Sequence, residues 1–260
     1  MCLVLNVLKR IETTDMKRLI LVLSALALGV CAYAQDLDDT WNYPPLLSAN
    51  DAPDSYYILP EAPLPNDAIF AYDYSQYLWG KLQRNTPRGE QAAEDAKLDI
   101  DHVLANFSPC MGAVLSRETT PTLAHLLAGL VNLEATTTAK NYYQRVRPFV
   151  LFNEPSLTPD DEPYLRNNGS YPSGHSAFGW AVALILAEIN PDRQNEIFKY
   201  GFEFGQSRVI CGVHFQSDVD AGRVMGEAAV ARLHADKEFM KKLEKAKKEF
   251  SKVAKKYPVK

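Results

Sequence analysis

A cation, an imidazole and a carboxylate lie close together in the stretch from Ser207 to Asp218. His214 and Asp218 are four residues apart, so on a helix they would share one face and hydrogen-bond. A carboxylate that accepts the Nδ1 proton of a histidine leaves Nε2 bare, as a base or a nucleophile. Arg208 adds a planar, permanently charged group that suits a tetrahedral oxyanion. Taken alone, such a pair is more often a structural surface pair than a catalyst.

Two further stretches carry groups that attract anions. Lys140 and Arg147 are seven residues apart, which on a helix is two turns and places them on one face, as a phosphate site or as a solvated basic face. Pro172-Ser173-Gly174 precedes the apolar run 177–189, and free backbone N–H groups at such a helix start bind anions. His175 would stand at this helix start, although a plain turn and N-cap also explain the Ser-Gly pair.

The three stretches together form one ordered pattern. Lysine, six residues and Arg-Pro come first, then Pro-Ser-Gly-His, then Ser-Arg, five residues, histidine, three residues and aspartate. This pattern resembles the type-2 phosphatidic acid phosphatase superfamily, which also contains the vanadium haloperoxidases. More narrowly, residues 82–89, 169–175 and 205–212 resemble segments of the class A bacterial non-specific acid phosphatases. The resemblance extends from about residue 56 into the C-terminal helix.

The resemblance implies a role for each motif residue. His214 would attack phosphorus and form a phosphohistidine, Asp218 would orient it, and His175 would protonate the leaving oxygen. Phosphate binding is implied for three cations and two hydrogen-bond donors: Lys140, Arg147, Arg208, Ser173 and the amide of Gly174. Together these groups supply charge, a nucleophile and an acid without a metal or any other cofactor, and the sequence has no Cys/His cluster at zinc spacing. The expected enzyme is therefore a metal-independent acid phosphatase acting on small phosphomonoesters.

Two other functions stay open at this point. A vanadium haloperoxidase would use much the same residues to hold vanadate; the class A-like flanks and the short chain favour the phosphatase, and peroxide-dependent halide oxidation with vanadate separates the two. A non-catalytic, exported phosphate-binding protein would use the same cations to hold phosphate but would hydrolyse nothing. Hydrolysis of p-nitrophenyl phosphate in EDTA would distinguish the phosphatase from such a protein. The leaving group of the substrate is not given by the sequence, and an alcohol in place of water would give phosphotransfer.

The N-terminus is typical of an exported protein. A leader is expected over residues 1–34, with a signal peptide, Met16–Ala34, made of a charged start, an apolar run and the cleavage site Ala32-Tyr33-Ala34. The alternative is a lipoprotein anchored at Cys31, but bulky Val30 makes a poor lipobox. Cleavage after Ala34 would give a periplasmic or secreted bacterial protein with no stable membrane insertion.

Removal of the leader would leave Cys110 and Cys211 as the cysteines of the mature chain. Two cysteines in an oxidising compartment are compatible with one disulfide, which would brace the segment that carries His214. Two buried free thiols are the alternative.

Apolar periodicity and proline positions predict an all-α protein, a single-domain helical bundle with an extended Pro-rich N-terminal arm. The arm is expected over residues 35–67 and the helical phosphatase domain over 68–260. Helices are predicted over 68–84, 89–99 and on towards Phe107, 122–138, 177–189, 193–208, 217–233 and 237–256, with an irregular loop over 148–166.

Charge and composition narrow the range of partners. A net charge of −4 and a pI near 5.8 argue against a dedicated nucleic-acid binder. The lysines of 237–256 are predicted to form a solvated face. Whether the protein forms a homo-oligomer is left open by the sequence.

Overall fold

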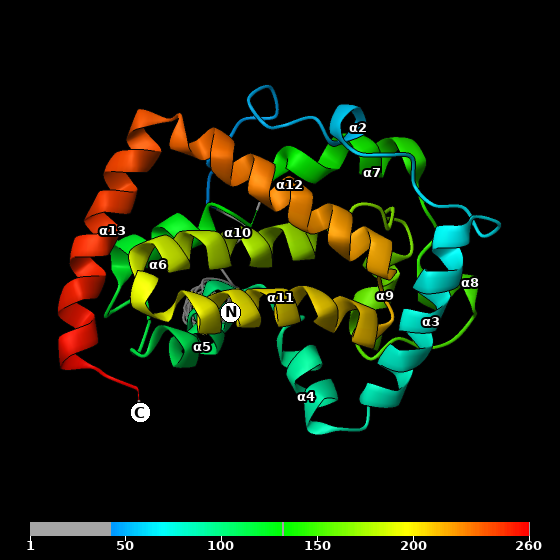
Figure 1. Cartoon of the computed structure of the whole chain (residues 1–260), viewed down its shortest axis with the longest axis horizontal. Coiled ribbons are helices and arrows are strands. Elements are labelled where there is room, and N and C mark those ends of the chain that lie inside the picture. Colours follow the sequence, from blue (N-terminus) through cyan, green and yellow to red (C-terminus); the bar gives the residue numbers. More distant parts are fainter. Residues whose placement is uncertain (1–42, 132, 260) are drawn as a thin grey trace, which may run out of the picture. The chain divides into compact units, whose positions relative to one another are not determined.

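Three long helices meet at the centre of the fold: α10 (Gly174–Ile189), α11 (Gln194–Cys211) and α12 (Gln216–His234) (Figure 1). The structure is a computed structural model that describes residues 43–131 and 133–259. α10 is nearly all apolar and is buried between α11 and α12, which both pack along it. The predicted central position of 177–189 is confirmed, because a helix that is apolar all round must be covered on every side.

Glycines bring α12 against the start of α10. A Cβ atom at Gly222 would lie 2.4 Å from the carbonyl oxygen of Ser173, and one at Gly226 would lie 2.5 Å from that of Ala177. Val224, in contrast, is 45% exposed and lies on the outer side of the helix.

The remaining helices surround this centre. They are α2 (Ser55–Ile58), α3 (Ala68–Gln83), α4 (Pro87–Glu94), α5 (Ile100–Met111), α6 (Pro121–Ala128), η2 (Glu134–Thr136), α7 (Thr137–Tyr143), α8 (Pro148–Leu151), η3 (Pro159–Asp161), α9 (Glu162–Leu165), η4 (Pro191–Arg193) and α13 (Lys237–Lys256). Apart from an isolated bridge between Ala113 and Pro258, residues 43–131 and 133–259 contain no strand. The predicted all-α class is confirmed.

Three predicted helix boundaries differ from the structure. The expected helix 122–138 is divided, because α6 ends at Ala128 and the chain resumes helical form only at η2. The chain leaves the helix after Glu94 and starts α5 afresh, where Asp99 caps the new helix by accepting the N–H of His102. α11 continues past Arg208 to Cys211, and Gly212 ends it with φ 76°, a conformation that favours glycine.

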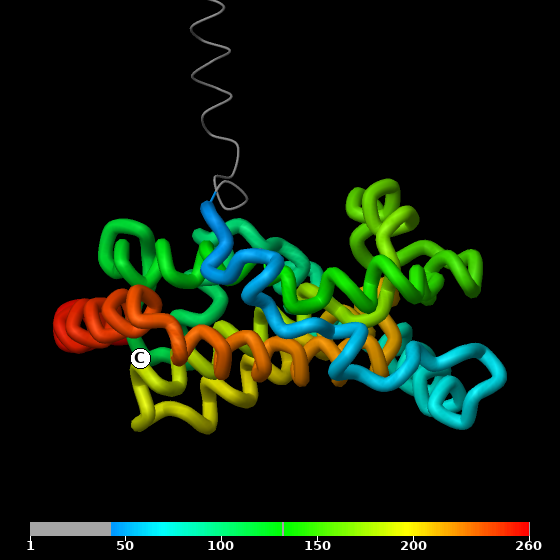
Figure 2. The backbone as a smooth tube through the Cα atoms, turned by 90° about the horizontal axis from the view of Figure 1, so that it is seen from above, coloured from blue at the N-terminus to red at the C-terminus, as the bar shows by residue number. Residues whose placement is uncertain are grey.

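The described part of the predicted arm, residues 43–67, is non-helical except for α2. Its buried leucines, Leu47 and Leu59, join the main apolar cluster, and the carbonyl of Pro60 accepts a hydrogen bond of 3.0 Å from the hydroxyl of Tyr171. In Figure 2 this segment (blue) runs beside the green α7, which α2 contacts. Residues 35–42 and the predicted leader lie outside the described residues.

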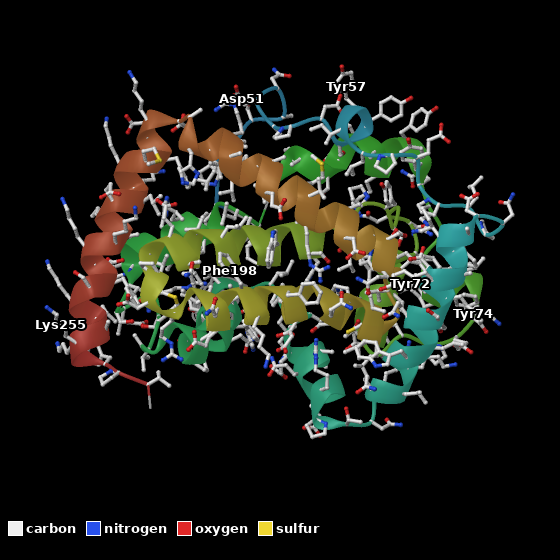
Figure 3. All side chains as sticks on the ribbon, in the orientation of Figure 1. Asp51, Tyr57, Tyr72, Tyr74, Phe198 and Lys255 are labelled. Carbon is white, nitrogen blue, oxygen red and sulfur yellow. The ribbon has the colours of Figure 1, made fainter. Side chains whose placement is uncertain are left out.

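Helix α3 exposes much of its apolar surface. Tyr77 is buried, but Tyr72 is 54% exposed, and Figure 3 shows its ring and that of Tyr74 on this helix. The one carboxylate of α3, Asp73, is instead fully buried. α3 therefore exposes aromatic rings and buries its carboxylate, which indicates that the carboxylate has a specific partner in the interior.

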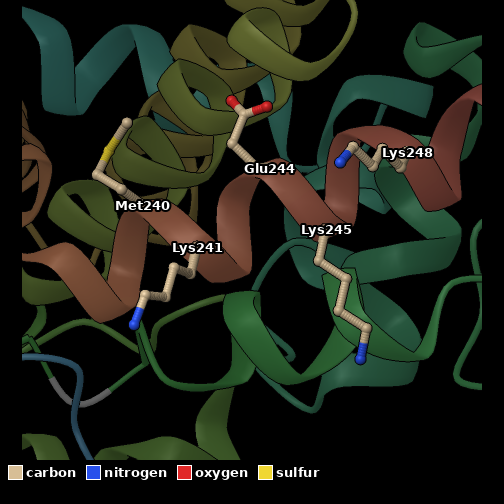
Figure 4. Close-up of a pocket in the computed structure, with 5 residues that line it drawn as sticks. All are labelled: Met240, Lys241, Glu244, Lys245 and Lys248. Atoms are coloured by element: carbon tan, nitrogen blue, oxygen red, sulfur yellow. The ribbon is translucent and has the colours of Figure 1, made fainter.

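Helix α13 spans the predicted 237–256. Its apolar residues, such as Leu243 and Phe250, are buried, and its lysines face outward. Figure 4 shows a shallow surface pocket on this helix, lined by Met240, Lys241, Glu244, Lys245 and Lys248. The lysine face is therefore solvated, as predicted. No helix in the described part of the chain is long and apolar enough to cross a membrane.

The disulfide considered from the sequence is not formed. Cys110 and Cys211 are both free, buried thiols that belong to different apolar clusters. The Sγ of Cys110 donates to the carbonyl of Phe107, and that of Cys211 donates to the carbonyl of Ala92. Burial raises the pKa of both thiols, that of Cys110 to about 12, so the neutral form is favoured.

Candidate active site

His214 lies in the short turn between α11 and α12, not on a helix. The backbone N–H groups of Val213 and His214 both donate to the carbonyl of Arg208, which holds the turn against the end of α11. Asp218 follows in the first turn of α12 and accepts the N–H of Phe215 at 2.8 Å. The predicted shared helix face is therefore wrong. The pair meets because the turn folds back over the start of α12.

The Nδ1 side of His214 faces a carboxylate and a hydroxyl. Nδ1 lies 3.5 Å from Oδ2 of Asp218 and 3.3 Å from Oγ of Ser170, and Ser170 donates to the same Oδ2 at 2.5 Å. Burial alone would raise the pKa of Asp218, but its hydrogen bond to His214 and the charge of Arg145 hold that pKa well below its usual range. The carboxylate stays ionised, so it favours the tautomer with the proton on Nδ1.

The other ring nitrogen of His214 faces Arg147. Nη1 of Arg147 donates to Nε2 at 2.9 Å and to the carbonyl of Val213 at 2.9 Å. Because a guanidinium can only donate, Nε2 is unprotonated and its lone pair accepts the hydrogen bond from Arg147. Burial and the neighbouring Arg147 lower the pKa of His214 well below its usual value, so the imidazole is neutral. This is the protonation state that a nucleophile requires.

Lys140 and Arg147 do not share a helix face as predicted. α7 ends at Tyr143, and Gln144 turns the chain with φ 45°. The two cations meet instead at the carbonyl of Gly169, which accepts from Lys140 at 2.9 Å and from Arg147 at 3.4 Å. Burial and the charge of Arg147 lower the pKa of Lys140 to about 7, and burial and Arg208 lower that of Arg147 to about 10. A bound anion would relieve this repulsion between buried cations.

Arg208 has more unpartnered buried donors than any other cation in the described part of the chain. Its side chain is 4% exposed, and its Nε and Nη1 are buried without any hydrogen-bond partner in the described structure. Buried donors are almost always paired, so an oxyanion is the natural partner here.

Ser173 and Gly174 form the start of α10 as predicted. Ser173 is the N-cap, and its side chain accepts the N–H of Ser176 at 3.2 Å. Its own N–H donates to the backbone carbonyl of Asp218 at 2.9 Å, which joins the starts of α10 and α12. Gly174 is the first residue of α10, where backbone N–H groups lack helical partners.

His175 lies one residue further along α10. Its ring stacks on Phe204, with centroids 4.8 Å apart and planes at 16°, and its Nε2 lies 2.6 Å from the carbonyl oxygen of Asp95. A carbonyl can only accept, so Nε2 carries a proton and Nδ1 is the nitrogen that titrates. Burial and the charge of Arg208 lower the pKa of His175 well below its usual value.

Sequence reasoning missed the groups behind Asp218. Arg145 donates to Oδ1 of Asp218 at 2.6 Å and to Oδ2 of Asp73 at 2.8 Å, and Asp73 also accepts from the backbone and hydroxyl of Ser217. All of these polar atoms are buried or nearly so. The ion pairs fix the carboxylate that faces His214 and tie α3 to α12.

Signals for some of these groups are present in the sequence. Asp73 is the one acid in α3, a helix otherwise rich in apolar and aromatic residues. Ser170 lies inside the motif segment 169–175, and Arg145 is two residues before Arg147. Nothing in the local sequence singles out the carbonyl of Asp95. Over residues 43–131 and 133–259, no group of three or more His, Cys, Asp or Glu side chains is arranged to hold a metal ion.

Known proteins are similar to this chain over most of its length. The model of the PAP2 superfamily matches residues 121–239, which include all eight predicted site residues. A non-specific acid phosphatase from Providencia stuartii is 44% identical over 248 residues, covering 92% of this chain and the whole of that protein. One from Salmonella typhimurium is 44% identical over 80% of this chain and 84% of its own length, and an acid phosphatase from Zymomonas mobilis is 37% identical over 75% of each. The chain therefore belongs to the PAP2 superfamily and, within it, to the family of bacterial non-specific acid phosphatases.

Proposed function

We propose that this acid phosphatase is exported and hydrolyses small phosphate monoesters, without a metal ion, through a phosphohistidine on His214. The observation that carries the proposal is the state of His214: Nδ1 faces Asp218 and Ser170, and the unprotonated Nε2 accepts from Arg147 beside other buried cations. That arrangement suits nucleophilic attack on phosphorus better than simple anion binding.

In the first step, Nε2 of His214 attacks phosphorus and the bond from phosphorus to the leaving oxygen breaks. Arg147 exchanges its bond to Nε2 for a phosphoryl oxygen, and Arg208 supplies its unpartnered Nε and Nη1. The proton on Nδ1 of His175 passes to the leaving oxygen. Burial and the charge of Arg208 both lower the pKa of His175, and a bound dianion offsets the charge of Arg208.

In the second step, Nδ1 of His175 takes a proton from water and the hydroxyl attacks phosphorus. The nitrogen–phosphorus bond breaks, which releases phosphate and restores neutral His214. An alcohol in place of water would give transfer of the phosphoryl group.

The charges available support the proposed metal independence. Lys140, Arg147 and Arg208 offset the charge of the transferring group, and the two histidines supply nucleophile and acid. Uncatalysed monoester hydrolysis demands accelerations up to ~10²¹, so a single hydrogen bond could not suffice and a full cationic site is needed. We expect hydrolysis of p-nitrophenyl phosphate to persist in EDTA; loss of activity that added divalent metal restores would overturn this part of the proposal.

The two histidines can be tested separately. His214→Ala should abolish turnover of every substrate, because no covalent intermediate can form. His175→Ala should retain partial activity on p-nitrophenyl phosphate and little on an alkyl phosphate, whose more basic leaving group needs the proton. The measurement is kcat/KM for both variants on both substrates, with acid-quench trapping of labelled enzyme.

The same experiment also includes results that would contradict the proposed roles. The His175→Ala variant should accumulate phosphohistidine, because the attacking water has lost its base. Equal losses on both substrates for His175→Ala, or phosphate trapped on His214→Ala, would mean that the two roles are reversed.

A further inference from the structure

The carbonyl that holds His175 belongs to Asp95, the residue at the end of α4. Asp95 is fully buried, although it lies in a charge-rich surface helix, and no role for it follows from the sequence motifs. Its peptide oxygen accepts Nε2–H of His175 at 2.6 Å and so decides which nitrogen can carry the transferable proton.

The side chain of Asp95 is held by three donors. The hydroxyl of Tyr200 and the amide of Gln91 reach Oδ1 at 2.6 and 2.8 Å, and the hydroxyl of Ser207 reaches Oδ2 at 2.5 Å. Arg88 supports this arrangement by donating to Oγ of Ser207 at 2.9 Å. Tyr200 and Ser207 are both on α11, so the carboxylate binds the end of α4 to α11.

This attachment places the carbonyl and the imidazole relative to each other. The ring of His175 is stacked on Phe204 of α11, and the carbonyl that fixes its Nε2 is anchored to the same helix through Asp95. Ser207 is followed directly by Arg208, so one helix positions the acid, its acceptor and a phosphate-binding cation.

We propose that Asp95 is a positioning residue for the general acid: its carboxylate, clamped by Tyr200 and Ser207, holds its own carbonyl on Nε2 of His175 and so directs Nδ1 to the leaving oxygen. The inference rests on the proposed function, since it requires His175 to protonate the leaving group. Asp95 itself does not touch the substrate or the reacting atoms. Its loss should therefore appear as a partial loss of acid catalysis.

The test uses leaving-group dependence, which lowered stability alone would not change. General acid catalysis contributes about 10²–10⁴-fold, and we expect Asp95→Asn to lose roughly 10-fold more kcat/KM on an alkyl phosphate than on p-nitrophenyl phosphate. Tyr200→Phe, which removes one donor to the carboxylate and keeps the ring against Phe204, should show the same bias to a smaller extent. It serves as the second variant if Asp95→Asn does not fold.

The double variant His175→Ala/Asp95→Asn completes the experiment. If Asp95 acts through His175, adding Asp95→Asn to His175→Ala should leave the alkyl-to-aryl ratio unchanged. Thr120→Val is the matched control, because it removes the two hydrogen bonds that the hydroxyl of buried Thr120 makes with the backbone of Ser116, and neither bond involves these groups. It should lower kcat/KM equally, if at all, on both substrates.

The possible failures are distinguishable. If His175→Ala shows no leaving-group bias, the acid role fails and the inference falls with it. If His175→Ala shows the bias but Asp95→Asn and Tyr200→Phe lose activity equally on both esters, the proposed function stands and the inference is overturned. The same bias in Thr120→Val would also overturn it, because the readout would then follow stability.

Discussion

His214 and His175 share one buried site but face different acceptors. His214 directs Nδ1 to the carboxylate of Asp218 and the hydroxyl of Ser170, whereas His175 directs Nε2 to a peptide carbonyl. A carboxylate stabilises a positive charge on its histidine far better than a neutral carbonyl does. At the residue scale, this difference would favour the proposed cationic phosphohistidine at position 214 and a readily released proton at position 175.

Lys140 gives the residue-scale prediction. Its pKa is lowered to about 7, so in the free enzyme its charge is present below that pH and lost above it. Binding of an anion should therefore weaken as the pH rises through about 7. Sulfate remains a dianion over the whole range, so its inhibition constant, measured from about pH 5 to 9, reports the enzyme alone.

Lys140→Arg is the matched variant for this measurement. Arginine stays charged throughout, so the rise in the inhibition constant near pH 7 should move to higher pH by about 1 unit or more, even if sulfate binds more weakly overall. An unchanged rise in Lys140→Arg would assign the titration to another group.

At the scale of elements, the site depends on how closely α12 approaches the start of α10. Ser173 and Asp218 are joined through their backbones, and the approach is possible because position 222 has no Cβ. Three helix ends thus place the N-cap of α10, the turn that carries His214 and the carboxylate that faces it.

Gly222→Ala tests this contact. Alanine gains about 1 kcal/mol of helix propensity, but its Cβ would lie 2.4 Å from the backbone oxygen of Ser173, which cannot rotate away. We expect a net loss of about 1–3 kcal/mol in the free energy of unfolding, measured with urea. Displacement of Ser173 and Asp218 should also lower kcat/KM about 10-fold.

Val224→Ala is the control on the same helix, because that side chain is largely exposed. It should change the free energy of unfolding by less than about 0.5 kcal/mol. A Gly222→Ala variant as stable and as active as the wild type would show that α12 can move away from α10 without cost.

At the scale of the whole molecule, the structure predicts that the stability of the protein is the same under oxidising and reducing conditions. Cys110 and Cys211 are separate buried thiols, so a reducing agent should leave the melting temperature unchanged. A disulfide would instead contribute roughly 2–4 kcal/mol. Thiol labelling of the mature protein, unfolded without reduction, should modify both cysteines; modification of neither would show that they are bridged.

Export gives the second prediction at this scale. The charged start, the apolar run and Ala32-Tyr33-Ala34 predict a mature N-terminus at Gln35. The intact mass of the protein secreted by its native host should match residues 35–260. A retained Met16, or a lipid on Cys31, would contradict cleavage at this site.

The sequence alone determined the helical class, the central place of 177–189, the bounds of α13 and the residues of the three motifs. These succeed because apolar periodicity reports burial locally, and because motif chemistry depends on residue types at fixed spacing. Helix ends were predicted less well: Gly129 marks the break after Ala128, but the apolar periodicity continues past it to Leu133.

The tertiary structure alone decided how the site is assembled. Helical spacing suggested that His214 met Asp218, and Lys140 met Arg147, on shared helix faces. The first pair instead meets through the turn before α12, and the second meets at the carbonyl of Gly169. The supporting contacts of Asp73 and Asp95 join segments far apart in the chain. A local pattern contains no information about such contacts, because they exist only once helix packing has brought buried charges within hydrogen-bonding distance.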